Sequence, residues 1–385
     1  MRPAEPVRSA GSARTAGPAE TAESADSAAA GGRPAPRHGL LVGPLGFAWR
    51  PRVLIATLVA ALLALALVVT AIAVGGAEVS VPDILRTLAG RGSTFDRLIV
   101  ITLRMPRVLT GALVGLALGV AGALMQTVTR NPLATPDVVG VTSGASLGAV
   151  AAVVIGGGGE SVGGLLLGAG MPTVAALGAV AAAALVYGLG WRGGGVEGYR
   201  LVLVGIGVAA MLDAGTSYLL VRARITQATA ASQWLVGSLS GASWDGVRPL
   251  LVAVAVLVPL ALAGSAALAV SHLGDGVARG VGLPVQLHRL TVVALTVLLT
   301  AAAVAAAGPV GFVAFVAPQI AVRAAGTARP PLLLSGLAGA CLVLLADTLA
   351  RTVFPWDVPV GIVTTVVGAP YLIWLLVRHR KEMTT

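Results

Sequence analysis

The chain has 385 residues, of which 56% are hydrophobic and only 11% charged, and its mean hydropathy is +0.91. A chain this apolar has too little polar surface to cover a water-soluble globule, which excludes a soluble fold. The net charge of +10 does not indicate nucleic-acid binding, because the basic residues stand in loops that flank apolar segments, as membrane topology requires.

The two ends of the chain differ in composition from the rest. Residues 1–49 are rich in Ala, Ser, Pro and Gly and contain no apolar run. Such a segment cannot bury enough surface to offset its chain entropy, so we predict a disordered cytoplasmic N-terminal tail over 1–49. It lacks the short apolar core of a secretory signal. Residues 380–385 are predicted to form a cytoplasmic C-terminal tail.

Between the tails, residues 50–379 contain one apolar segment after another. About 20 helical residues cross a hydrocarbon core of ~30 Å, and segments of that length recur. We therefore predict an all-α fold, a polytopic membrane domain with about ten transmembrane helices. The predicted spans are roughly 53–74, 106–128, 143–155, 172–191, 200–221, 249–271, 289–307, 310–325, 332–352 and 359–377.

The basic residues at the two ends of this domain predict its orientation. An even number of spans places both termini on one side of the membrane. Arg50 and Arg52 before the first span and the basic run 378–381 after the last span favour the cytoplasm for both termini. Arg104 and Arg107, which open the second span, then lie outside, where the positive-inside rule does not place arginines.

Several kinds of chemistry are missing from the sequence. Lys381 is the only lysine, so the chain cannot contain a Walker A loop, and any ATPase must be a separate polypeptide. The single cysteine, Cys341, excludes an internal disulfide. The four histidines are scattered without ligand partners, so we predict neither a metal site nor a cofactor. No nucleophile–base pair indicates an enzyme.

Two glycine series predict close helix packing. Gly111, Gly115 and Gly119 recur every four residues, as do Gly140, Gly144 and Gly148. Small residues at this spacing let helix backbones approach closely in a membrane. We expect both series to pack inside one subunit, and the alternative is that they line a transport pathway.

Five blocks of sequence carry a family resemblance. They are 103–148 (including LRMPR, LMQTVTRNPLA and GVTSGASLG), 273–284, 307–320, 346–351 and 359–370. In this order they resemble the permease subunits of bacterial ABC importers for iron–siderophore complexes, haem and cobalamin, over about 53–378.

This resemblance implies a type II ABC importer fold like that of the cobalamin-importer permease. It also implies a multi-pass permease of the cell membrane that takes up iron–siderophore complexes, or haem or cobalamin. The implied partners are ABC ATPase subunits, an extracytoplasmic substrate-binding lipoprotein, and a second permease that is either a copy or a paralogue. Membrane lipid surrounds such a protein, and no nucleic acid is expected.

Three arginines match family positions for docking the binding protein. Arg104 and Arg107 lie on one helical face, and Arg351 ends the ninth span. The resemblance implies that they receive acidic side chains of the binding protein, which suits bidentate guanidinium–carboxylate pairs. The alternative is that they snorkel to the interface or pair with Asp96 and Asp347.

A polar segment at 272–288 separates two apolar spans. Asp275 can cap a short helix that Pro284 ends. The small residues spaced four apart predict a smooth face that can seat in a groove, and the resemblance makes the segment the one that meets the ATPase. The predicted coupling residues are Gly274, Asp275, Ala278, Arg279 and Gly282.

Asp213 is the most central charge within a span. An ionised Asp at a helix centre costs about 2.5–3.5 kcal/mol on insertion scales, so it should face protein or a wet pathway. We keep both interpretations, a neutral or paired buried Asp and a pathway residue, and assign Gln319 no chemistry. An ion-coupled secondary transporter is the alternative function. It needs intramembrane acids, for which only Asp213 and Asp347 are candidates.

Overall fold

The computed structural model describes residues 39–42, 45–48, 50–75, 79–156, 170–192, 195–196 and 198–382. Residues up to Pro51 form a unit of their own, separate from Arg52–Thr385. In the first unit, β1 (Gly39–Val42) pairs with the antiparallel β2 (Leu45–Ala48), a hairpin that the sequence analysis does not predict. Most of the predicted N-terminal tail lies outside the described residues.

Ten apolar helices of the second unit correspond to the ten predicted spans, which confirms the all-α membrane fold. Within the described residues, seven are long and apolar enough to cross a membrane, and three contain shorter apolar segments, Val141–Ile155, Val313–Ala325 and Val360–Trp374. Their bounds are α2 Pro51–Ala73, α5 Met105–Thr129, α6 Val141–Ile155, α7 Met171–Gly190, α8 Gly198–Arg222, α10 Trp244–Ala263, α13 Val285–Ala307, α14 Val313–Ala325, α15 Leu332–Thr352 and α16 Val360–Glu382.

Short elements connect these helices. They are α3 Val81–Leu88, α4 Thr94–Arg97, the π-helix η1 Leu98–Arg104, the 3-10 helix η2 Pro136–Val139, α9 Ile225–Leu235, α11 Ser265–His272, α12 Asp275–Gly280, and the strands β3 Trp191–Arg192 and β4 Gly195–Val196, which pair antiparallel. The predicted bounds of two spans are wrong. The second span continues backward through η1 to Thr94, and the sixth ends at Gly264, whose low helix propensity separates α10 from α11.

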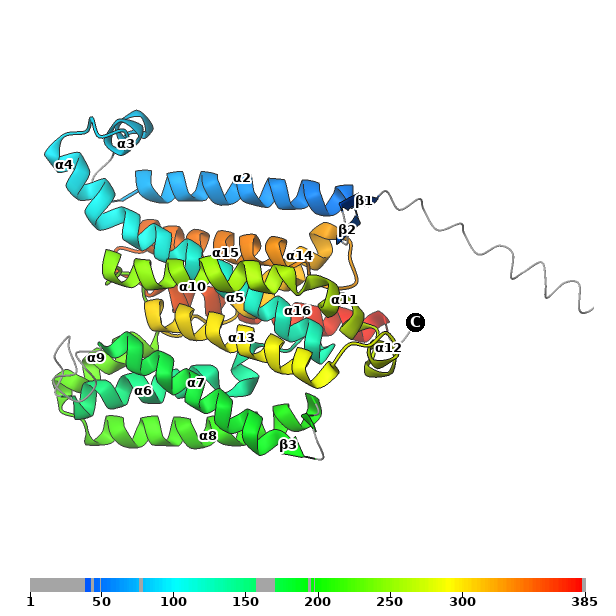
Figure 1. Ribbon diagram of the computed structural model, residues 1–385. Helices are drawn as coiled ribbons and strands as arrows, with labels where there is room; N and C mark the ends of the chain where they lie inside the picture. The colour runs from blue at the N-terminus through cyan, green and yellow to red at the C-terminus, as the bar shows by residue number, and fades with distance from the viewer. Residues whose placement is uncertain are drawn as a thin grey trace, which may run out of the picture. The chain divides into compact units, whose positions relative to one another are not determined.

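Helix α5 lies at the centre of the bundle (Figure 1) and packs against α10, α13, α14 and α15. Its contact with α15 depends on small residues. A Cβ on Gly115 would overlap the carbonyl oxygen of Gly339, and one on Gly119 would overlap that of Ser335. Gly144 of α6 meets the backbone of Gly178 on α7 in the same way. Both glycine series therefore pack inside the subunit as expected.

The bundle has two ends that matter for function. Figure 1 shows α3 and α4 at one end and α12 at the opposite end. We call the first the arginine end, because Arg104, Arg107 and Arg351 lie there, and the second the α12 end. At the α12 end Arg52 Nε donates to the carbonyl oxygen of Ala324 at 3.1 Å, which joins the start of α2 to the end of α14.

Candidate functional site

At the arginine end, two arginines cap the first transmembrane helix. The last carbonyls of a helix lack intrahelical partners, and α2 has no basic residue in its last turn. Arg104 Nη1 donates to the carbonyl oxygens of Ile72 at 2.7 Å and Ala73 at 3.0 Å. Arg351 adds longer bonds of 3.2 and 3.3 Å to the oxygens of Val74 and Ala71. Their positive charges also offset the negative end of the helix dipole.

Arg107 and Arg351 share a single carboxylate. Arg107 donates from Nε at 3.0 Å and from Nη2 at 2.9 Å to Asp347 Oδ1. Arg351 Nε lies 3.0 Å from Asp347 Oδ2. The side chain of Asp347 is 2% exposed, against 17% for Arg107 and 14% for Arg351. The expected alternative of pairing with Asp347 is therefore confirmed for these two arginines.

Asp96, the other expected partner, has a different role. It accepts hydrogen bonds from the backbone N–H and hydroxyl of Ser93 and closes a capping box at the start of α4. From α4 the chain continues into the π-helix η1, whose last residue, Arg104, lies against the end of α2. Local π-helical turns are often found at functional sites.

At the α12 end, Asp275 is held by arginines from two transmembrane helices. Arg130 Nη2 donates to Oδ1, and Arg289 Nη2 donates to Oδ2 at 3.1 Å. Arg130 also donates twice to the carbonyl oxygen of Ser271, at 3.2 and 3.0 Å, and Arg289 Nη1 donates to that of Val196. Partial burial alone would raise the pKa of Asp275, but the two arginines outweigh it and lower this pKa below its usual value.

The small residues of this segment do not all face outward. Ala278 is fully buried against its own subunit, so the expectation that the small-residue face seats in a partner's groove is wrong at this position. Gly274 has φ of 114° and Gly282 has φ of 83°, a region that favours glycine. These two residues allow the chain to turn into and out of α12.

The exposed face of this segment is apolar instead. Leu273, Val277 and Val281 recur every four residues and are each more than half exposed. We call these three residues the α12 ridge. The side chain of Arg279 is also exposed. The sequence pattern contained this signal, because an apolar i, i+4, i+8 series in a polar loop is visible without a structure.

Asp213 lies on an exposed face of α8, three residues from the helix midpoint, which is about 4.5 Å along the axis. The same face carries Ile206, Ala210 and Ser217, all exposed. Among the described residues, no side chain forms an ion pair with the Asp213 carboxylate. The interpretation of a buried, paired Asp inside the subunit is therefore wrong for the part of the chain that the structure describes.

Gln319 has a structural role that the sequence analysis did not find. Its Nε2 donates to Gln126 Oε1 at 2.8 Å, and Gln126 Nε2 donates to the carbonyl oxygen of Phe315 at 3.2 Å. Both side chains are buried. A hydrogen-bonded pair of this kind joins α5 to α14, and burying either amide alone would leave a polar group unsatisfied.

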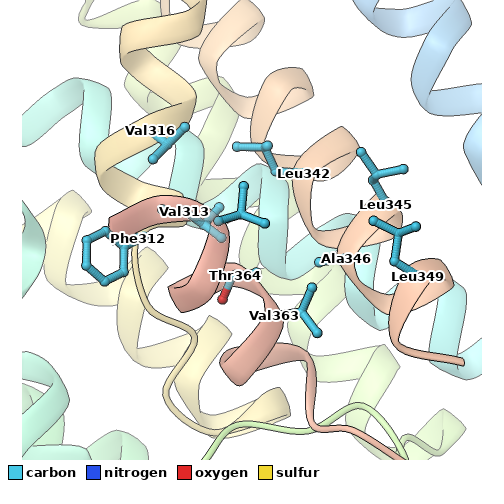
Figure 2. A pocket seen from close by; sticks show the side chains of 11 residues that line it. Phe312, Val313, Val316, Leu342, Leu345, Ala346, Leu349, Val363 and Thr364 are labelled. Carbon is cyan, nitrogen blue, oxygen red and sulfur yellow. The ribbon is translucent and has the colours of Figure 1, made fainter. Parts of the chain in front are cut away.

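One pocket lies between α14, α15 and α16 (Figure 2). Its lining is apolar, including Phe312, Leu345 and Val363, and the Thr364 hydroxyl donates to the carbonyl oxygen of Gly361 at 3.1 Å. No charged side chain lines it, so it does not suit a polar metal chelate. Within the described residues, no cluster of three or more His, Cys, Asp or Glu side chains could hold a metal ion.

The many apolar spans define a multi-pass membrane protein. The FecCD transport family matches residues 62–378, so the chain belongs to this family of transport permeases.

Known proteins are similar over most of their length. The chain is 41% identical over 325 residues to the achromobactin transport system permease protein CbrC of Dickeya dadantii, which covers 83% of this chain and 90% of that protein. It is 38% identical to the ferric enterobactin transport system permease protein FepG of Escherichia coli, with 80% and 91% covered. A solved metal-chelate type ABC transporter in an inward-facing conformation is similar with a TM-score of 0.74, 25% identity, and 84% and 98% covered.

Proposed function

We propose that this protein is a permease subunit of an ATP-driven importer of ferric siderophores, with haem or cobalamin as alternative cargo. Separate ABC ATPase subunits would power it, and an extracytoplasmic binding protein would deliver the cargo to a pathway between it and a second permease. The carrying observation is the family match over residues 62–378, supported by relatives whose names refer to achromobactin and ferric enterobactin. Both termini would be cytoplasmic.

The arginine end would receive the binding protein. Arg107 and Arg351 hold the carboxylate of Asp347, and Arg104 lies near Arg351 at the end of α2. With Asp357, which also interacts with Arg351, the cluster keeps a net charge of +1 (three positive charges minus two). Arg107 directs two N–H groups at Oδ1 of the Asp347 carboxylate, and Arg351 lies against Oδ2. This supports the docking of acidic side chains from a partner, since charge complementarity steers and orients transient complexes.

The α12 ridge would contact the ATPase. Leu273, Val277 and Val281 are exposed apolar side chains in the same segment as the charged, exposed Arg279. An exposed apolar patch rimmed by polar groups marks a protein interface. Because the ridge lies at the end of the bundle where α2 begins, predicted to be cytoplasmic, an ATPase is the partner that this position favours.

Asp213 would line the pathway. Facing lipid, an ionised Asp near the centre of a span costs about 2.5–3.5 kcal/mol. The face that carries Ile206, Ala210, Asp213 and Ser217 is exposed in the single subunit. A water-filled space between two permeases would hydrate the carboxylate and remove most of this cost.

Reconstitution tests the proposal against the ion-coupled alternative. The permease is placed in proteoliposomes with a candidate ABC ATPase and a candidate binding protein from the same organism, and entry of a ⁵⁵Fe-labelled siderophore is measured. We expect uptake only with ATP and all components present. Accumulation driven by a proton or sodium gradient in liposomes that hold the permease alone would refute the proposal. Growth of a deletion strain on single iron sources then identifies the cargo.

A further inference from the structure

Asp275, the first residue of α12, is the point where this short helix is fixed to the transmembrane bundle. We propose that the Arg130–Asp275–Arg289 bridge transmits displacement of α12 to α5 and α13, so that Asp275, Arg130 and Arg289 are positioning residues for transport. The inference rests on the proposed function in one respect, namely that the ATPase moves α12.

The covalent connections of α12 are poor transmitters of force. The helix has six residues, Asp275–Gly280, and is flanked by Gly274 and Gly282, both with positive φ and with open space where a Cβ would lie. Glycine allows more backbone conformations than any other residue. A push on α12 would therefore be absorbed by rotation at these two joints unless another contact carried it.

The other contacts of α12 are few. Ala278 is its one buried side chain, and a methyl group can slide over its neighbours. The carboxylate of Asp275 instead makes directional, charge-assisted hydrogen bonds on both oxygens, one to Arg130 and one to Arg289. These bonds fix both the position and the rotation of the first turn of α12.

Arg130 and Arg289 connect Asp275 to the central helices of the bundle. Arg130 is the C-cap of α5 and has a left-handed backbone with φ of 53°, uncommon for a residue other than glycine. Helix α5 is buried along most of its length. Arg289 lies in the first two turns of α13, which packs directly against α5. Movement of Asp275 would thus reach two core helices at once.

The exposure of these three side chains indicates whether the bridge mainly transmits movement or mainly stabilises the folded protein. The side chains of Asp275 and Arg130 are 30% and 39% exposed, and that of Arg289 is 15% exposed. Because water reaches the Asp275 carboxylate, its ion pairs contribute less to folding stability than fully buried pairs do. Removing the charge of Asp275 should therefore leave a folded permease in which α12 is no longer held to α5 and α13.

The test is Asp275→Asn in the full importer with its ATPase and binding protein. The readouts are co-purification of the ATPase and the number of siderophores imported per ATP hydrolysed in proteoliposomes. We expect ATPase binding to persist and import per ATP to fall at least tenfold, with Asp275→Glu regaining most of it. Arg130→Gln and Arg289→Gln should reproduce the loss, and combining either with Asp275→Asn should add little.

Two further variants make the outcome unambiguous. Asp245→Asn at the opposite end removes an Asp from an exposed pair with Arg248 (3.8 Å) and should leave import per ATP unchanged. Val277→Asp on the α12 ridge should abolish ATPase co-purification. If Val277→Asp retains the ATPase, the proposed contact is wrong. If Asp275→Asn transports at the wild-type ratio, or does not fold, the transmission role is wrong.

Discussion

Replacing Asp347 by Asn tests whether the buried Asp347 carboxylate stabilises the arginines at this end of the bundle. The carboxylate is 2% exposed and is shared by Arg107 and Arg351. Removing one partner of a buried ion pair costs about 3–5 kcal/mol, because the remaining charge is left uncompensated. Arg351 keeps its bonds to the end of α2, so most of the loss falls on Arg107. We therefore expect a cost near 3 kcal/mol.

With an unfolding entropy of about 2.1 cal/mol/K per residue, Tm of a chain of this size shifts by about 1.2 °C per kcal/mol, so this cost corresponds to a fall in Tm of roughly 4 °C. The six tryptophans allow unfolding to be followed by intrinsic fluorescence in detergent or nanodiscs. Asp245→Asn is the matched control, because that side chain is 94% exposed and its removal should not shift Tm measurably. An Asp347→Asn protein with the Tm of the control would refute the buried-pair reasoning.

Three further predictions concern packing, pH and the pathway. Gly115→Leu should prevent folding, judged by gel filtration, because its Cβ would meet the backbone of Gly339, whereas Gly188→Leu in open space should be tolerated. Because the pKa of Asp275 is lowered in the folded protein, the bridge is complete above the usual value of 3.8 and is lost only as pH falls through the lower folded value. Import per ATP should thus be constant from about pH 8 to about pH 5 in proteoliposomes, and a loss near neutral pH would contradict this. Asp213→Leu should retain ATPase binding yet change uptake of differently charged ferric chelates unequally, whereas equal uptake of all of them would remove Asp213 from the pathway.

The sequence determines the helical part of the fold well, because long apolar segments and glycine spacing are local signals. The close contact of α5 with α15 follows from Gly115 and Gly119, and the structure confirms it. Helix ends are less predictable. The π-helical extension before Arg104 depends on tertiary contacts with the end of α2, and no residue pattern within Leu98–Arg104 indicates it.

The candidate site was predictable in its residue types, and pairing with Asp347 was one of the expected arrangements, but the sequence could not decide between pairing and docking. Arg107 and Asp347 are 240 positions apart, and only the packing of α5 on α15 brings them together. The burial of Ala278 could not be read from a spacing of four, because a six-residue helix presents several such faces. Arg130 and Arg289 were not singled out for the same reason. Each is an ordinary loop-flanking arginine until the fold places it beside Asp275.

The two ends of the bundle contain the same arrangement of side chains, but its carboxylate is more deeply buried at the arginine end. In each, one Asp is shared by two arginines, Arg107 and Arg351 around Asp347, and Arg130 and Arg289 around Asp275. The carboxylate of Asp347 is 2% exposed and that of Asp275 is 30% exposed. Since water screens a pair and offers replacement hydrogen bonds, removing the Asp275 carboxylate should cost less folding stability than removing that of Asp347. Under the proposed function, the Asp275 bridge would move together with α12, while the buried carboxylate of Asp347 would hold the arginine end in place.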